Sequence, residues 1–426
     1  MYPGPIGAGT VSSGEVETES SMPNHADESI GARIASYRNL AGYTQREFAE
    51  HSHLSLGNIR KVERGERLPT HGFLATAART LAVSVEELTG QPYRGQQRSD
   101  EKAHAPIVAI RTVVRAFDLP PEWRTTPRPL ADIAGDLEEA TRHRAAARYT
   151  RLGLALPELL EELTAAVHLL EGDRKRQAAK MLASAYYMAH CLAYRLGYAD
   201  LAGQLDDRQR WAAGMSADPL TVALSQWSRA GGFQAAREYG AGLRLLAHAR
   251  DQLTEEAGTS SSSVVTLLGS LRLREATLAS RARDEQATEH HLTEASRLAE
   301  QIPDQTDRVR YHLTFGPANV AVHDIAAQVE LKNADEAAKR ASALRLPPSL
   351  PRTRRGHHHI DAARAFLAVG DRDKALTALQ DARQVAPQQT RYHPMAREAV
   401  RLLAQQYRRV GQDVRTLAAW MGQAVA

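Results

Sequence analysis

Four basic side chains follow one another closely in a short, helix-forming part of the chain. Arg60, Lys61, Arg64 and Arg67 lie within the run GYTQREFAEHSHLSLGNIRKVERGERLP, which spans residues 42–69. Cationic donors at this density can pair with the phosphate oxygens of a nucleic acid. The alternative is a solvated helix face on which the arginines pair with neighbouring glutamates. Which interpretation holds depends on the elements that position these side chains.

The first of these elements is a predicted short helix that begins after Thr44. A threonine in this position can cap the helix, because its hydroxyl accepts a hydrogen bond from a free backbone amide in the first turn. Phe48 and Ala49 are then expected to face inward. A tight turn at His53 and Leu54 ends the helix.

The second element is a predicted helix that Ser55 can cap and that Ile59 and Val62 anchor in the core. Gly65 ends it, since glycine takes the left-handed backbone conformation of a helix C-terminus without strain. Two short helices joined by a few residues form a helix-turn-helix arrangement.

Residues 29–92 resemble the lambda-repressor-like, xenobiotic-response-element family of DNA-binding domains. The segment LATAARTLAVSVEELTG continues the resemblance, and His53 departs from it because the family usually has glycine in that turn, so some strain is expected there. The matching residues are Arg38, Thr44, Gln45, Ala49, Leu54, Ser55, Ile59, Glu63, Gly65, Arg67 and Pro69.

The resemblance implies that the second helix enters the major groove of double-stranded DNA. Lys61 would then donate to guanine O6 and N7, and Leu56 would touch a thymine methyl group. Gln45 would hold a phosphate or brace a base contact. The full DNA-binding set expected on this basis is Thr44, Gln45, Ser55, Leu56, Gly57, Asn58, Arg60, Lys61, Arg64 and Arg67, with the three arginines on phosphates. Gly57 has no side chain with which to contact a base on this helix face, so DNA shape should contribute to specificity.

A single module of this size makes few base contacts. Useful specificity normally requires two modules on two half-sites about 34 Å apart. We therefore expect a homodimer on an inverted-repeat operator, held together largely by the C-terminal part.

The chain divides into four segments by composition and pattern. Residues 1–28 are expected to form a disordered tail, 29–93 the helix-turn-helix domain, 94–106 a polar linker, and 107–426 an all-helical regulatory and dimerisation domain. No convincing strand is predicted. The fold class is therefore all-α, a five-helix DNA-binding domain followed by a helical superhelix.

The C-terminal part has a repeating pattern of helix pairs. Its clearest unit, residues 356–389, resembles a tetratricopeptide repeat, with small Ala363 and Ala375 where two helices cross and Pro387 ending the second. Stacked units of this kind form a superhelix with a concave inner surface. The alternative is an irregular helical bundle.

This architecture resembles quorum-sensing regulators that bind a peptide, and residues 315–323 (FGPANVAVH) with RYHPMAREAVRLL resemble actinobacterial regulators. A peptide or small-molecule signal is therefore one expectation, with Asn319, His323, His357 and Arg364 as candidate ligand contacts. These side chains could instead hydrogen-bond between repeats. A further alternative is a scaffold whose repeats dock a partner protein.

Other functions find little support in the sequence. No catalytic motif is present, so we expect no enzyme, no catalytic residue and no cofactor. Consecutive histidines such as 357–359 diverge around a helix and predict no metal site. The single cysteine, Cys191, is expected to be a buried thiol. No apolar run predicts a membrane span or secretion signal, so we expect a cytoplasmic protein; the net charge of +4 alone indicates little.

Overall fold

The computed structural model of the chain describes residues 28–94, 98–119, 126–259, 261–302, 306–406 and 411–423. The expected tail, except Glu28, lies outside these ranges. The all-α fold class is confirmed. The expectation that no strand forms is wrong at one place, where β1 (Arg308–Arg310) pairs antiparallel with β2 (Leu313–Phe315). Strands of three residues are too short to show an alternating pattern in the sequence.

The N-terminal domain contains five helices around a small apolar core. Ile34, Phe48 and Ile59 are fully buried in it, and Leu88 closes it from the last helix. The helices are α1 (Ile30–Leu40), α2 (Gln45–Ser52), α3 (Leu56–Glu63), α4 (His71–Thr80) and α5 (Val85–Thr89).

The segment expected as a linker contains a short helix, α6 (Arg98–His104). Asp100 is buried there and accepts hydrogen bonds from Arg391 at 2.7 and 2.8 Å and from the Tyr392 hydroxyl at 3.0 Å. A polar, unpatterned stretch therefore packs through one buried ion pair whose partner lies far along the sequence. Within the segment expected as a linker, residues 98–104 are therefore helical and packed against the end of the chain's helical domain.

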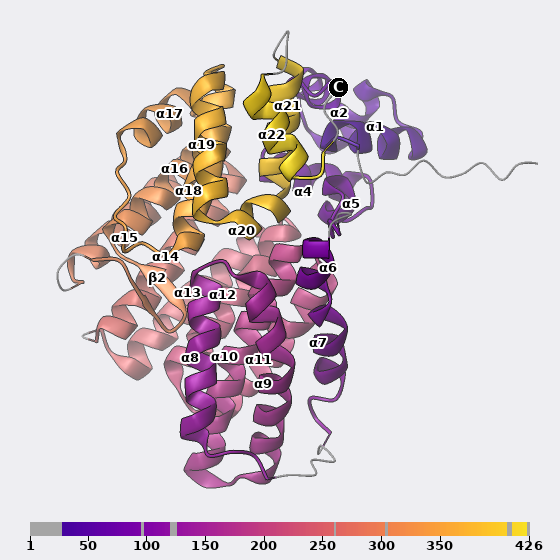
Figure 1. Cartoon of the computed structure of the whole chain (residues 1–426). Coiled ribbons are helices and arrows are strands. Elements are labelled where there is room, and N and C mark those ends of the chain that lie inside the picture. Colours follow the sequence, from indigo (N-terminus) through magenta and orange to yellow (C-terminus); the bar gives the residue numbers. More distant parts are fainter. Residues whose placement is uncertain are drawn as a thin grey trace, which may run out of the picture.

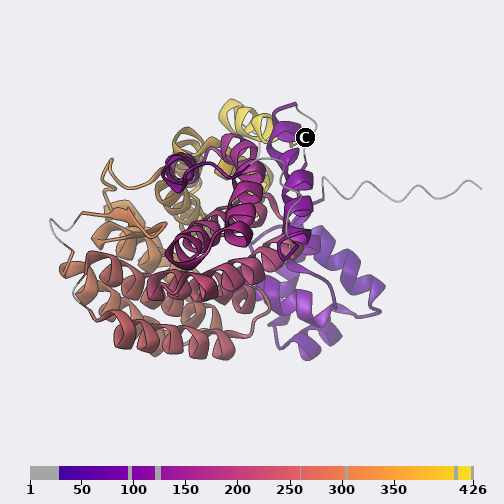
Figure 2. The same cartoon turned by 90° about the horizontal axis from the view of Figure 1, so that it is seen from below.

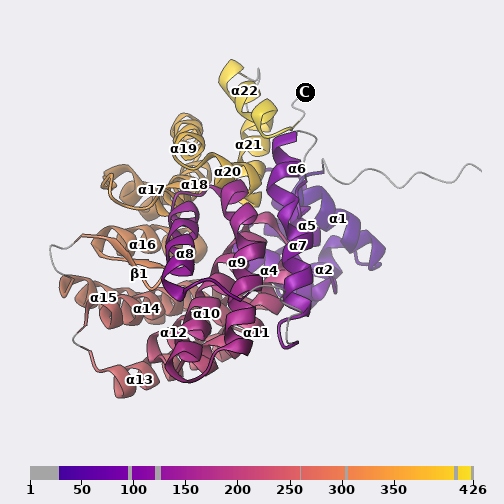
Figure 3. The same ribbon diagram turned by 60° about the horizontal axis from the view of Figure 1, so that its bottom comes forward.

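The remaining helices form successive hairpins along a curved path (Figures 1 and 3). Neighbouring helices pack on each other because a short connection returns the chain antiparallel. They are α7 (Pro106–Arg115), α8 (Leu130–Ala145), α9 (Tyr149–Leu169), α10 (Gly172–Leu196), α11 (Ala199–Ser216), α12 (Pro219–Ala235), α13 (Tyr239–Ala257), α14 (Ser262–Ala282), α15 (Glu285–Glu300), α16 (Pro317–Leu331), α17 (Ala334–Ala343), α18 (Arg352–Ala368), α19 (Arg372–Val385), α20 (Pro387–Tyr392), α21 (Pro394–Gln406) and α22 (Gln412–Trp420).

The predicted repeat at residues 356–389 corresponds to the hairpin of α18 and α19. Ala363 and Ala375 are both fully buried where the helices cross. α19 ends at Val385, and Pro387 begins α20. Small residues at the crossing and a proline after the second helix are therefore placed as the pattern predicted.

The two ends of the described chain share one apolar core. Ile30 and Phe73 of the N-terminal domain belong to the same buried cluster as Met395, Val400 and Leu417 of the last helices. Figure 1 shows α21 and α22, in yellow, beside the N-terminal domain, in indigo, and Figure 2 shows that this domain lies at one edge of the molecule. The DNA-binding domain is thus docked on the repeats. Within the described ranges, every helix is too short or too polar to cross a membrane.

Candidate DNA interface

Helix α2 begins as the sequence predicts. The Thr44 hydroxyl accepts a hydrogen bond from the Glu47 amide at 3.2 Å, and the Glu47 carboxylate accepts one from the Thr44 amide at 2.7 Å. This reciprocal capping box satisfies two amides that would otherwise lack a partner. After the helix, His53 adopts a left-handed conformation with φ of 56°, so the strain expected in place of glycine is present.

Helix α3 follows the turn and packs its apolar side on α1. Ile59 and Val62 are buried, and a side chain at Gly31 of α1 would sit 2.0 Å from the Val62 carbonyl oxygen. Ser55 occupies the N-cap position, but among the described residues its side chain caps no backbone amide. Gly65 has φ of 68° just after the helix, as predicted.

The opposite side of α3 faces solvent. Gly57, Arg60, Lys61 and Arg64 are exposed, and Leu56 is half-buried. Arg67, in the loop after the helix, is exposed as well.

One member of the expected base-contacting set does not fit. Asn58 is only 8% exposed, so the expectation that it faces base edges is wrong. It lies one position before Ile59 on the edge of the buried side, and its Oδ1 has no partner among the described residues.

Gln45 is half-buried, and its side-chain amide group bonds to another side chain of the domain. Its Nε2 donates to Glu63 at 2.7 Å, and Arg38 donates to both oxygens of the same carboxylate at 2.7 and 3.0 Å. Glu63 therefore ties α1, α2 and α3 together. The bidentate pair of Arg38 with Glu63 fixes α3 on α1, and the hydrogen bond from Gln45 fixes α2 on α3, so together they brace the exposed face.

The arginines differ in whether they have an internal partner. Arg64 donates to Glu66 at 2.6 and 2.9 Å, and these hydrogen bonds to the carboxylate raise the pKa of the guanidinium. This matches the alternative of a paired, solvated arginine. Arg60, Lys61 and Arg67 have no carboxylate within 4.0 Å in the described part of the chain. An exposed ion pair such as Arg64 with Glu66 is weak enough for a phosphate to displace it.

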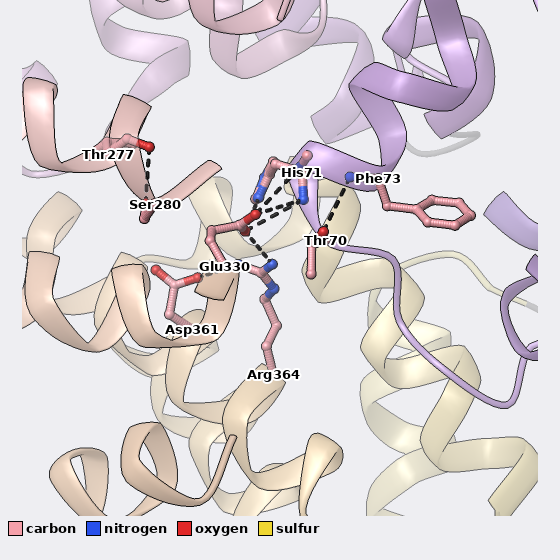
Figure 4. A network of polar contacts seen from close by, with 9 residues as sticks. Thr70, His71, Phe73, Thr277, Ser280, Glu330, Asp361 and Arg364 are labelled. Atoms are coloured by element: carbon pink, nitrogen blue, oxygen red, sulfur yellow. Dashed lines mark hydrogen bonds and ion pairs between the residues drawn. The ribbon is translucent and has the colours of Figure 1, made fainter. Parts of the chain in front are cut away.

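A buried polar network joins the DNA-binding domain to the repeats (Figure 4). Glu330 of α16 accepts hydrogen bonds from His71 Nδ1 at 2.8 Å, from the His71 amide at 3.1 Å and from Arg364 at 2.7 Å. Burial alone would raise the pKa of the Glu330 carboxyl, but His71 and Arg364 outweigh it and hold that pKa well below its ordinary range. An ionised Glu330 therefore anchors the first turn of α4.

Two candidate ligand residues have internal partners instead. Arg364 is buried and pairs with Glu330 and with Asp361 at 2.8 Å, so the expectation that it meets a ligand in the groove is wrong. Asn319 is buried at the start of α16, where its Nδ2 donates to the Thr314 carbonyl at 2.8 Å. The alternative of a hydrogen bond between repeats holds for Arg364, which joins α18 to α16, whereas the bond of Asn319 is local.

The other two candidates, His323 and His357, are brought near each other. They lie on α16 and α18 and influence each other electrostatically, together with Arg354 and Arg195. Burial lowers the pKa of both imidazoles well below the ordinary value. Sequence reasoning missed the arginines around them. In the described ranges, no group of three or more His, Cys, Asp or Glu side chains could hold a metal ion.

A cavity of about 310 Å³ separates the end of α3 from the repeats. Asn58, Lys61 and Arg67 line it from the DNA-binding domain, and Lys332 and Arg364 line it from the repeats. Arg364 belongs both to the lining of this cavity and to the network of Figure 4. A movement of Arg364 in the cavity would therefore alter its hydrogen bond to Glu330.

Comparison with known proteins identifies the N-terminal domain. A family described as "Helix-turn-helix domain" matches residues 29–89. The uncharacterized HTH-type transcriptional regulator YazB of Bacillus subtilis strain 168 is 41% identical over 58 residues, which are 14% of this chain and 84% of that one.

Two further proteins show weaker likeness. The cryptic phage CTXphi transcriptional repressor RstR of Vibrio cholerae serotype O1 is 37% identical over 62 residues, which are 15% of this chain and 55% of that one. The crystal structure of Bacillus thuringiensis PlcR in complex with the peptide PapR7 and DNA covers 64% of this chain and 95% of that one at 14% identity, but its TM-score of 0.27 supports no conclusion.

The match to YazB covers most of that protein, and the structure forms the helix-turn-helix that the match requires. The chain therefore belongs to the HTH-type transcriptional regulators, and residues 29–89 are its DNA-binding domain.

Proposed function

We propose that this regulator binds an inverted-repeat operator as a homodimer, with α3 in the major groove of each half-site. The exposed face of α3 carries the proposal, because Arg60, Lys61 and Arg64 point to solvent while the other side of the helix is anchored. Lys61 is the residue suited to a base edge, and Arg64 to a phosphate. Such a regulator works where the chromosome is, which we propose is the cytoplasm.

Dimerisation follows from the small number of base contacts that one α3 can make. Sedimentation equilibrium of the full-length protein, alone and with a captured operator, tests it directly. We expect two chains per operator. One chain per operator at saturating protein would contradict the proposed dimer while leaving DNA binding intact.

The repeats are proposed to control DNA binding through a peptide or small-molecule signal. Support comes from the docking of the DNA-binding domain, since His71 and Gly72 begin α4 on the buried carboxylate of Glu330. A signal that binds one arrangement of the two domains better than another shifts the balance between them. The alternative, a scaffold that docks a partner protein, calls for an exposed apolar patch, whereas the charged interior of the repeats favours a ligand.

Operator affinity in the presence of a low-mass extract tests the gating. Fluorescence anisotropy of a labelled operator should shift with extract for the wild-type chain. A matched extract passed over immobilised wild-type protein should lose this effect. An affinity that does not respond to extract would favour the scaffold.

A further inference from the structure

Arginines from several repeats gather on the inner side of the helical domain. Arg144 ends α8, Arg195 ends α10, Arg274 and Arg281 lie on α14, and Arg354 begins α18. Each of these inner arginines is partly exposed, so solvent reaches it. Arg354 is within electrostatic range of Arg144, Arg195 and Arg274, so arginines from four helices lie close to one another.

The inner arginines have no acidic partner. Across the described ranges, no carboxylate lies within 4.0 Å of any of them, whereas Arg38, Arg364 and Arg391 each pair with a buried carboxylate. The Nε atoms of Arg144, Arg274 and Arg281 are buried without a hydrogen-bond partner. Burial, together with the neighbouring arginines, lowers the pKa of the Arg354 guanidinium to about 10. Such a concentration of like charge is unfavourable unless an anion relieves it.

Aromatic rings lie beside two of the inner arginines. The Arg274 guanidinium lies 3.9 Å from the ring centre of Trp227, and the Arg144 guanidinium lies 5.3 Å from that of Tyr187. The two rings are 6.2 Å apart. Arg144 also donates to the His312 carbonyl and Arg274 to Gln234 at 3.4 Å, but neither has an acidic partner in the described ranges. Aromatic rings beside such guanidinium groups suit a ligand that combines a flat ring with negative charge.

We propose that the interior of the repeats binds a small phosphate-bearing anion with a flat ring, the chemistry of a nucleotide. This inference deepens the proposed gating and rests on it for its biological meaning. Anion binding itself involves neither DNA nor α3, so anion binding and the gating of DNA binding can be tested separately.

The site has a physical route to the DNA-binding domain. A cavity of about 90 Å³ is lined by Arg195, Arg281 and His393 on the repeat side and by His71 and Glu86 on the side of α4 and α5. His71 is also the partner of Glu330. An anion that draws Arg195 or Arg281 inward therefore changes the charge facing the docking network.

The single cysteine provides a local reporter. Cys191 lies four residues from both Tyr187 and Arg195, on the same face of α10. It is partly exposed, so the expectation of a buried thiol is wrong. We would measure its rate of modification by a neutral thiol reagent with adenosine triphosphate, pyrophosphate or adenosine present. At a ligand concentration ten times Kd, the rate should fall about tenfold with adenosine triphosphate. Pyrophosphate should protect more weakly, and adenosine hardly at all.

Two variants separate a built site from nonspecific binding. Arg354→Gln removes one inner charge, so its melting temperature without ligand should equal or exceed that of the wild type, while protection of Cys191 drops at least fivefold. Arg352→Gln, an exposed position on the same helix, should behave as wild type. Absence of protection in the wild type, or equal protection in both variants, would overturn the proposal. DNA binding measured on the same samples would be unaffected by that failure.

Discussion

Glu330→Gln should loosen the DNA-binding domain from the repeats. The substitution keeps the shape of the side chain but removes the buried negative charge that Arg364 and His71 face. Arg364 retains one carboxylate, Asp361 at 2.8 Å, and the first amides of α4 lose an ionic acceptor.

The expected cost follows from the burial of this carboxylate, which is 6% exposed. Removing one partner of a fully buried ion pair costs about 3–5 kcal/mol. Because an amide oxygen can still accept one hydrogen bond and Asp361 remains, we expect about 2–3 kcal/mol. A loss of that size corresponds to roughly 30- to 150-fold in the opening equilibrium.

Hydrogen exchange measures this opening where it should occur. The amides of His71 and Gly72 donate directly to Glu330, so peptides covering the start of α4 should exchange roughly 30- to 150-fold faster in the variant. Peptides from α10, far from the substitution, should change little. The matched control is Glu336→Gln, whose pair with Arg340 is partly exposed and should cost less than about 1 kcal/mol.

Unchanged exchange at the start of α4 would refute the role assigned to Glu330. Equal acceleration in α4 and α10 would also refute it, because the substitution would then weaken the whole chain rather than the docking of one domain.

Three further predictions concern the DNA-binding domain and the pH response. Lys61→Ala should reduce the free energy of operator binding by about 1–3 kcal/mol and relax the base preference at one position. Arg64→Ala should weaken binding to all DNA sequences alike and reduce its salt dependence. Equal effects of the two substitutions in anisotropy titrations would contradict these roles. Thr44→Ala should lower the free energy of unfolding by about 1 kcal/mol in urea titrations, because α2 loses its N-cap. An unchanged free energy of unfolding would show that the capping box does not stabilise the domain. Burial, reinforced by Arg195, holds the pKa of His357 well below 6.5, so the unfolded chain binds a proton that the folded chain does not. The stability that this histidine contributes is therefore fully present above about pH 6.5 and is lost as the pH falls below that value. His357→Asn should reduce the slope of the unfolding free energy against pH by up to about 1.4 kcal/mol per pH unit between pH 6 and 5. An unchanged slope would count against a buried neutral imidazole.

Local signals made much of this fold predictable. Thr44 and Gly65 mark helix ends by interactions within a few residues, and the structure places both as expected. The hairpin at 356–389 was also predictable, because small residues must stand where two helices cross closely. In each case the determining contacts lie within a short stretch of sequence.

Contacts between distant residues were not predictable in the same way. Asp100 is buried because it pairs with Arg391, which lies 291 positions away, so a polar stretch that looked like a linker forms a helix. Arg364 and Asn319 have the right residue types for ligand contacts, but their partners are supplied by the fold. The inner arginines left only a weak signal, the spacing of Tyr187, Cys191 and Arg195 on one helix face.

DNA recognition through the exposed face of α3 is tested most directly by capturing sheared genomic DNA with the full-length protein and with Lys61→Ala, then sequencing what each retains. We predict that the wild-type chain enriches sharp sites containing an inverted repeat. The variant should enrich the same sites weakly, with one position in each half-site no longer specified. No enriched sites with the wild type, or identical sites and sequence preferences with both proteins, would contradict recognition by α3.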